Sequence, residues 1–264
     1  MSASLYAGKR AVVTGAGGFI GSHLCEALVR SGACVRALVR YTSTSSHGHL
    51  ARLPADVRGS IDVTLGNVED PANVRALVKG ADVVFHLAAL IGIPYSYVAP
   101  YQYVATNVQG TLNVLEAVRE QAVAKMVHTS TSETYGTARS VPIDESHPLQ
   151  GQSPYSATKI GADKLAESYH LSFGVPVATI RPFNTYGPRQ SARAIIPTLM
   201  AQLAAGRTQI RMGSLDPVRD LNFVTDTVAG FLAVGASARA VGEVVNVGSG
   251  RAVSMGDLAR MIIE

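Results

Sequence analysis

The sequence has few cysteines, no cluster of basic residues and no long apolar segment. Its two cysteines, Cys25 and Cys34, have neither metal-ligand spacing nor a disulfide framework, which is typical of a reducing cytoplasm. Lys and Arg total 23 against 19 acids, a formal charge of +4, but they are scattered and form no nucleic-acid patch. No segment approaches the ~20 apolar residues of a membrane span. We therefore expect a cytoplasmic protein without a targeting signal, bound to neither membrane nor nucleic acid, which takes a small anionic ligand and no metal.

The apolar residues that are present occur in short runs. They make up 47% of the 264 residues, which suits one large domain or a domain with a smaller lobe. Such runs are typical of strands buried on both faces of a parallel sheet, and they lie at 10–14, 35–39, 61–65, 83–86 and 125–129. Helical patterns follow them, such as the one that begins at Asp70-Pro71 and stops at Gly80. This alternation predicts an α/β fold with a Rossmann-type doubly wound parallel sheet.

Residues 14–21, TGAGGFIG, form a glycine-rich turn between the first expected strand and the first expected helix. Glycines let the backbone approach a pyrophosphate, and a helix N-terminus presents unpaired N–H groups to it. An ordinary glycine-rich turn is the alternative, but the position in the first βαβ unit favours a dinucleotide. The contacts expected from this turn are Gly15, Gly18, Phe19, Ile20 and Gly21.

The end of the second expected strand, LVRYTSTSS, lacks the acidic residue that would bind a ribose 2′-hydroxyl. Arg40 with Thr42 and Ser43 suits a 2′-phosphate, which favours NADP over NAD. A solvated arginine beside a loop is the alternative. After the third and fourth strands, the residues expected to line the adenine and the middle of the cofactor are Asn67, Val68, Leu87, Ala88 and Ala89.

Tyr155 and Lys159 in SPYSATK are spaced i, i+4, so they share one face of a helix expected from about Tyr155 to Phe173. A lysine ammonium and an oxidised nicotinamide would both lower the pKa of the phenol from ~10 toward the working pH. The phenolate could then take a proton from a substrate alcohol that loses hydride. Taken alone, the pair is weak evidence, because a surface Tyr and Lys at helical spacing are common and that reading would normally be preferred; its value comes from the other motifs.

Residues 128–136, HTSTSETYG, follow the apolar part of the fifth expected strand. If the extended conformation continues, Thr129, Thr131 and Glu133 share a face, and Thr131 can share a substrate hydroxyl with Tyr155. A carboxylate out of water needs a partner, a substrate or a shifted pKa. The alternatives are a local hydrogen bond for Thr131 and an ion pair for Glu133.

Together, TGAGGFIGSHL, FHLAA, STSETYG, SPYSATK, RPFNTYGPRQ and RDLNFVTD resemble the extended short-chain dehydrogenases/reductases that act as nucleotide-sugar epimerases and dehydratases. The resemblance covers nearly the whole chain and implies tightly bound NADP or NAD and a nucleotide-diphosphate sugar as substrate. It places Thr131, Tyr155 and Lys159 on the family's catalytic hydroxyl, tyrosine and lysine. It further implies cofactor contacts from Tyr155, Lys159 and Pro182, and substrate contacts from Ser132, Asn184, Arg193 and Arg219.

Within this family Glu133 separates the possible reactions. A 4,6-dehydratase oxidises C4, removes the C5 proton, eliminates the C6 hydroxyl and returns hydride to C6, and Glu133 is the expected C5 base. A 4-epimerase, acting for example on UDP-glucose, UDP-N-acetylglucosamine or UDP-glucuronate, needs only transient oxidation at C4. A UDP-glucuronate decarboxylase instead releases carbon dioxide from C5. We expect a dehydratase first, then an epimerase, then a decarboxylase.

Two details of the resemblance bear on the substrate. Many dehydratases have an Asp-Glu pair where this chain has Ser132-Glu133, and the Thr-Ser-Glu version resembles GDP-mannose 4,6-dehydratases. The stretch 135–168 is similar to a bacterial dehydratase subgroup that acts on N-acetylglucosamine nucleotides toward legionaminic-type sugars. The alternative from another class is a non-catalytic dinucleotide-binding protein, and the intact Thr131, Tyr155 and Lys159 argue against it.

The expected organisation is a dinucleotide-binding domain at residues 1–182 and a smaller substrate lobe at 183–264. Some segments of the lobe, such as 244–247, are expected to return to the main sheet. The resemblance also implies a chain that continues past Glu264, and a homodimer formed through the helix starting near Tyr101 and the helix that carries Tyr155.

Overall fold

The computed structural model describes residues 5–264; residues 1–4, in which the sequence predicts no targeting signal, lie outside the described range. The strands of its large sheet are β1 (Arg10–Thr14), β2 (Cys34–Arg40), β3 (Ile61–Gly66), β4 (Val83–His86), β5 (Lys125–Thr129), β6 (Val177–Pro182) and β9 (Val244–Val247). They are ordered β3-β2-β1-β4-β5-β6-β9, and every neighbouring pair is parallel. The predicted doubly wound α/β fold is therefore confirmed.

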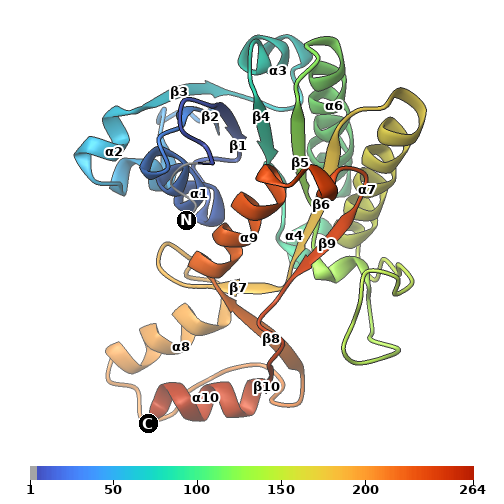
Figure 1. The fold of residues 1–264 in the computed structure, drawn as a ribbon. Helices are drawn as coiled ribbons and strands as arrows, with labels where there is room; N and C mark the ends of the chain where they lie inside the picture. The colour runs from blue at the N-terminus through green and yellow to red at the C-terminus, as the bar shows by residue number, and fades with distance from the viewer. Residues whose placement is uncertain (1–4) are drawn as a thin grey trace.

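Helices cover both faces of this sheet (Figure 1). One face packs against α1 (Phe19–Arg30) and α9 (Val224–Ala236), and the other against α3 (Pro71–Val78), α6 (Gly110–Glu120) and α7 (Pro154–Phe173). Successive side chains of a strand point to opposite faces, so Val13 belongs to the core under α1 and α9, and Val12 to the core under α3 and α6.

Local signals read from the sequence set several helix ends. Asp70 accepts a hydrogen bond from the Ala72 amide at 2.9 Å, with Pro71 as the first helical residue of α3. Ser153 and Ser156 form a capping box at the start of α7. Gly174 ends α7 in the left-handed conformation, with φ +68°.

The smaller lobe hangs below the large sheet in Figure 1 and carries the C-terminus. Its three-stranded sheet has the order β10-β8-β7 and consists of β7 (Asn184–Tyr186), β8 (Val218–Phe223) and β10 (Ala252–Ser254). Helices α8 (Ile195–Ala204) and α10 (Met255–Ile263) pack against each other beside it. The chain therefore leaves the large sheet after β6, builds β7, α8 and β8 of the lobe, re-enters the large sheet through α9 and β9, and returns to the lobe with β10 and α10.

Short elements fill the connections. They are η1 (Gly48–Arg52) and α2 (Ala55–Gly59) after β2, α4 (Ile93–Ser96), α5 (Pro100–Tyr103) and η2 (Val104–Gln109) after β4, η3 (Ser132–Thr134) after β5, and η4 (Ala238–Ala240) before β9. Helices α5, η2 and α6 follow one another without a break, with η2 as a π-helical segment.

Two classes of feature are missing from the described part of the chain. No helix between residues 5 and 264 has both the length and the apolar character needed to cross a membrane. Within the same range, His, Cys, Asp and Glu side chains form no group of three that could hold a metal ion.

Candidate active site

A cleft of about 320 Å³ opens at the carboxyl ends of β1 to β4. The strand order reverses between β1 and β4, and ligands of doubly wound sheets bind at such a switch point. The cofactor residues predicted from the sequence that line it are Gly15, Arg40, Asn67, Val68, Ala88 and Ala89. The structure thus brings together residues from four separate strand ends, as the sequence predicts.

The glycine-rich turn fits a dinucleotide. Gly15 has φ +69°, and a Cβ atom there would lie 2.8 Å from the Ala88 amide nitrogen, so only glycine allows this close approach of two loops. A Cβ atom on Gly21 would collide with the Gly15 carbonyl oxygen. Gly18 is the N-cap of α1 and gives no side-chain cap, so the amides of Phe19 and Ile20 stay available for phosphate oxygens.

The charged side chains that line the cleft are both positive. Arg40 ends β2, Arg193 lies before α8, and both line the cleft, while no Asp or Glu of residues 5–264 does. The loop that follows Arg40 rests on the glycine-rich turn through a 2.9 Å hydrogen bond from the His49 amide to the Gly17 carbonyl. The loop therefore borders the place where a dinucleotide's ribose and phosphates would lie.

Tyr155 and Lys159 lie on the inner face of α7, 6% and 3% exposed. The Lys159 ammonium donates to the Thr129 carbonyl at 2.6 Å, and burial lowers the pKa of Lys159 to about 8. Burial raises the pKa of Tyr155 to about 12, against an opposing contact with the Thr131 hydroxyl. The sequence led us to expect that Lys159 and an oxidised nicotinamide would both lower the pKa of Tyr155. In the protein alone the effect of burial is larger and the pKa is raised, so that part of the expectation is wrong. A lowered pKa would require the charge of an oxidised nicotinamide.

The segment after β5 does not continue as a strand, which corrects the predicted alternation of Thr129, Thr131 and Glu133. Thr131 is still extended, but Ser132–Thr134 turn into η3, and the Thr131 hydroxyl accepts from the Glu133 amide at 3.2 Å. This local hydrogen bond is the alternative that the sequence left open for Thr131. A turn, rather than a strand face, therefore places Glu133.

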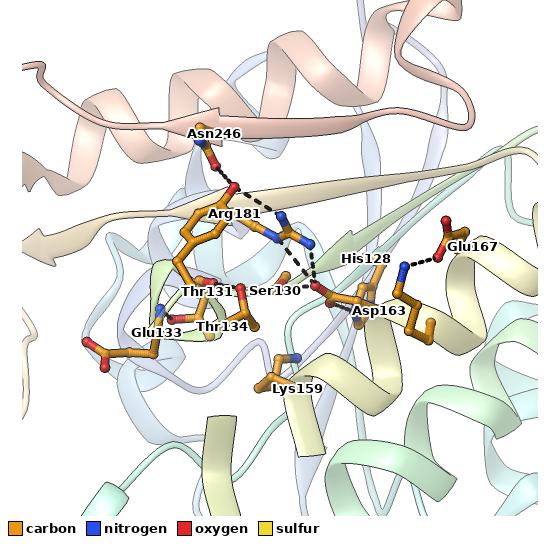
Figure 2. A network of polar contacts seen from close by, with 12 residues as sticks. His128, Ser130, Thr131, Glu133, Thr134, Lys159, Asp163, Glu167, Arg181 and Asn246 are labelled. Atoms are coloured by element: carbon orange, nitrogen blue, oxygen red, sulfur yellow. Dashed lines mark hydrogen bonds and ion pairs between the residues drawn. The ribbon is translucent and has the colours of Figure 1, made fainter. Parts of the chain in front are cut away.

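The Glu133 carboxylate is half-buried and forms no hydrogen bond or ion pair with any residue from 5 to 264. In Figure 2 the side chain of Glu133 points away from Lys159 and from the ion pair between Asp163 and Arg181. It lies close enough to Tyr155 for its charge to raise the pKa of the phenol. The ion pair considered for Glu133 is thus not formed, and the carboxylate is free to act on a ligand.

Tyr103 is a site residue that the sequence did not reveal. Its ring packs edge-on against Tyr155 at a centroid distance of 6.3 Å, and its hydroxyl donates to the Gly92 carbonyl at 2.6 Å. It also lines the cleft, together with Tyr95 of α4. An aromatic wall thus shields the buried phenol from water on one side, and only the tyrosines in YSYVAPYQY hinted at it.

The remaining predicted residues are spread over the neighbouring elements. Leu87 follows β4 and Pro182 ends β6. Asn184 lies on β7 and pairs with Leu221 of β8, while Arg219 is exposed and donates to its neighbour's carbonyl. Of the predicted substrate residues Ser132, Asn184, Arg193 and Arg219, only Arg193 lines the cleft.

Comparison with known proteins gives consistent matches over nearly the whole chain. The family model for GDP-mannose 4,6 dehydratase matches residues 12–264. A dTDP-glucose 4,6-dehydratase from Actinoplanes sp. is 34% identical over 260 residues, which cover 96% of this chain and 80% of the relative.

Solved structures agree with this match. A dTDP-glucose 4,6-dehydratase from Streptomyces venezuelae, crystallised with NAD, gives a TM-score of 0.87 at 32% identity and covers 96% of this chain and 80% of that one. A UDP-N-acetylglucosamine 4-epimerase from Methanobrevibacter ruminantium gives a TM-score of 0.88 at 28% identity, with 97% and 81% covered. Because the chain is similar to both, the choice between elimination and epimerisation depends on the residues of the site.

Proposed function

The chain belongs to the GDP-mannose 4,6 dehydratase family, and on that premise we propose that it is a nucleotide-sugar 4,6-dehydratase with a bound nicotinamide dinucleotide. The observation that carries the proposal is the free, half-buried carboxylate of Glu133 near the buried phenol of Tyr155. An epimerase needs one group that moves a proton at the C4 oxygen. A dehydratase needs a second base for the proton on C5, and Glu133 supplies it.

The roles follow from these positions. Tyr155 takes the proton of the C4 hydroxyl, Thr131 hydrogen-bonds to the same oxygen, and Lys159 keeps a positive charge nearby. Glu133 takes the C5 proton, which the C4 ketone acidifies, and gives a proton to the departing C6 hydroxyl, which leaves as water. A bound dinucleotide would accept the C4 hydride and return it to C6, and C5 would then take up a proton, which balances the one that Tyr155 removed from the C4 hydroxyl. Tyr103 and Tyr95 limit the access of water to this region.

For the cofactor we propose NADP over NAD. Arg40 lies at the end of β2 and supports this choice. In addition, none of the described residues that line the cleft is acidic. An arginine accommodates a 2′-phosphate, whereas NAD sites of this kind use a carboxylate on the ribose.

We further propose a homodimer that works in the cytoplasm. Val98, just before α5, is 76% exposed, and Tyr101, within α5, is 89% exposed. Exposed apolar side chains gathered in this way are typical of a protein contact. Cys25 and Cys34 are both free, which suits a reducing compartment.

The test is a panel of nucleotide sugars followed by mass spectrometry. It should contain dTDP-glucose, GDP-mannose, UDP-N-acetylglucosamine and UDP-glucuronate. A product that has lost one water supports the dehydratase. An isomer of unchanged mass would instead make the protein a 4-epimerase, and loss of carbon dioxide would make it a decarboxylase.

A further inference from the structure

We propose that Asp163 is a positioning residue for the reaction: it holds the helix that carries Tyr155 and Lys159 against the Thr131–Glu133 turn, and it places a carboxylate one helical turn from Lys159. The inference rests on the proposed function for its catalytic meaning. Asp163 does not line the cleft, and neither the family resemblance nor the sequence motifs assign it a role.

Asp163 continues the catalytic face of α7. Tyr155, Lys159 and Asp163 are each four residues apart, so they lie in a row on the side of the helix that meets the sheet. The carboxylate is 5% exposed. A charge buried to this extent persists only when partners surround it.

Those partners come from two strands of the sheet (Figure 2). Asp163 Oδ1 accepts from His128 Nε2 of β5 at 3.0 Å. Its Oδ2 accepts from the Ser130 hydroxyl at 2.7 Å and from Arg181 of β6 at 3.0 Å. One carboxylate therefore ties α7 to the ends of both β5 and β6.

The ion pair between Asp163 and Arg181 contacts the residues on both sides of the turn that contains Glu133. On one flank, Ser130 directly precedes Thr131. On the other, Tyr135 accepts from Arg181 Nη1 at 3.0 Å, lies under the guanidinium at 4.9 Å, and donates to Asn246 of β9 at 2.7 Å. The positions of Thr131 and Glu133 relative to α7 thus depend on the Asp163–Arg181 pair.

Asp163 also acts on Lys159 through its charge, although the two side chains share no hydrogen bond. The ammonium donates to a backbone carbonyl and forms no ion pair within residues 5–264. The titratable groups around it are Tyr155 and Asp163 of α7, His128 of β5, His86 of β4 and, behind Asp163, Arg181 of β6.

Of these groups only Asp163 is negatively charged near neutral pH. Burial lowers the pKa of both His86 and His128, so these imidazoles are neutral. Burial opposes ionisation of Asp163 as well, but its hydrogen bond from His128 and the nearby positive charges keep its pKa below the ordinary value. The charge of Asp163 raises the pKa of Lys159 against the larger effect of burial. Without it, the ammonium would lose its proton at a lower pH.

The experiment measures the titration of Lys159 directly. The chain has only five lysines, so ¹³Cε-lysine labelling of the full chain gives few NMR signals, and Lys159→Arg identifies the one from Lys159. In Asp163→Asn we expect its midpoint to move down by about one pH unit or more, since an opposite charge nearby has an effect of this size. Cofactor reduction by nucleotide sugar should also slow about tenfold with little change in KM.

Two further variants keep the result interpretable. Glu167→Gln removes an exposed carboxylate four residues along the same helix, paired with Lys164, and should leave the Lys159 titration and the rate unchanged. If Asp163→Asn does not fold because Arg181 is left unpaired, Asp163→Asn with Arg181→Gln removes both buried charges. It should still show a downward shift of Lys159, reduced by whatever effect the lost Arg181 charge has on the ammonium.

A folded Asp163 variant in which Lys159 titrates as in the wild type would overturn the inference. The titration does not depend on which sugar is the substrate. If the substrate panel shows no elimination while Lys159 still shifts, the proposed function fails and the electrostatic role of Asp163 stands.

Discussion

The ammonium of Lys159 donates a 2.6 Å hydrogen bond to the backbone carbonyl of Thr129, the last residue of β5. The lysine of the Y-x-x-x-K pair is therefore anchored on the strand end that leads into the Glu133 turn. This hydrogen bond uses one of the three ammonium protons of a side chain that is otherwise removed from water. One hydrogen bond does not replace the lost hydration of the charge, which explains why burial lowers the pKa of Lys159.

Lys159→Met should change the pH dependence of stability. The pKa of Lys159 falls from 10.5 in the unfolded chain to about 8 in the folded one. Between these values the unfolded chain binds more protons at this side chain, so its contribution makes the free energy of unfolding rise with pH. Urea denaturation of wild type and variant at several pH values in this window should show a steeper rise in the wild type, since the other groups with shifted pKa values, such as Lys125, contribute equally to both.

The pH range for this measurement has an upper limit, because Tyr155 also titrates there. The pKa of Tyr155 is raised from 10.0 to about 12 by burial, so above its unfolded value this side chain lowers stability as pH rises. Measurements should therefore stay below that value. An equal slope for wild type and Lys159→Met would contradict the buried, weakly compensated ammonium.

Tyr155→Phe should abolish turnover and leave the cofactor bound. The phenol is the group placed to accept the proton of the C4 hydroxyl, and loss of such a group costs ~10²- to 10⁴-fold in rate. Turnover and dinucleotide binding by fluorescence are the measurements, with Tyr101→Phe, on a residue that is 89% exposed, as the matched control. Unchanged turnover in Tyr155→Phe would remove the phenol from the mechanism.

Glu133→Gln should stop the reaction after oxidation at C4. The amide keeps the size of the side chain but cannot accept the C5 proton, so the reduced cofactor should accumulate and be visible by absorbance. Glu243→Gln changes an exposed carboxylate before β9, at the opposite end of the strands, and should turn over normally. Release of normal product by Glu133→Gln would show that another group removes the C5 proton.

Arg40→Ala should weaken the binding of NADP more than that of NAD. The guanidinium is placed to meet a 2′-phosphate, and we expect the ratio of the two dissociation constants to shift by about tenfold, the value of one charge-assisted contact. Equilibrium binding of both dinucleotides measures the ratio, and Arg239→Ala, on an exposed arginine of η4, is the control. An unchanged ratio would make NAD the expected cofactor.

The sequence predicted the fold and the place of the cleft because both depend on local signals. Short apolar runs gave the bounds of β1 and β4, and Gly15 and Gly21 are required by close backbone approaches that a side chain would block. An apolar run and a glycine-rich turn each occupy a few consecutive residues and can be recognised in the sequence, although the Ala88 backbone that Gly15 approaches lies far along the chain.

The parts that the sequence could not provide depend on contacts between distant segments. The turn at Ser132–Thr134 replaces an expected strand because Ser130 and Tyr135 are held by Asp163 and Arg181, which lie more than 25 residues further along the chain. The high pKa of Tyr155 comes from burial under Tyr103, which periodicity does not reveal. Both corrections concern the environment of the reacting groups, whose roles stay predictions until the variants are measured.

The most direct test of the account is the reaction run in deuterated water with the nucleotide sugar that the panel identifies. Elimination through Glu133 exchanges the C5 proton with solvent, so the product should have lost one water and carry deuterium at C5 by mass spectrometry and NMR. A product of unchanged elemental composition with hydrogen retained at C5 would contradict it.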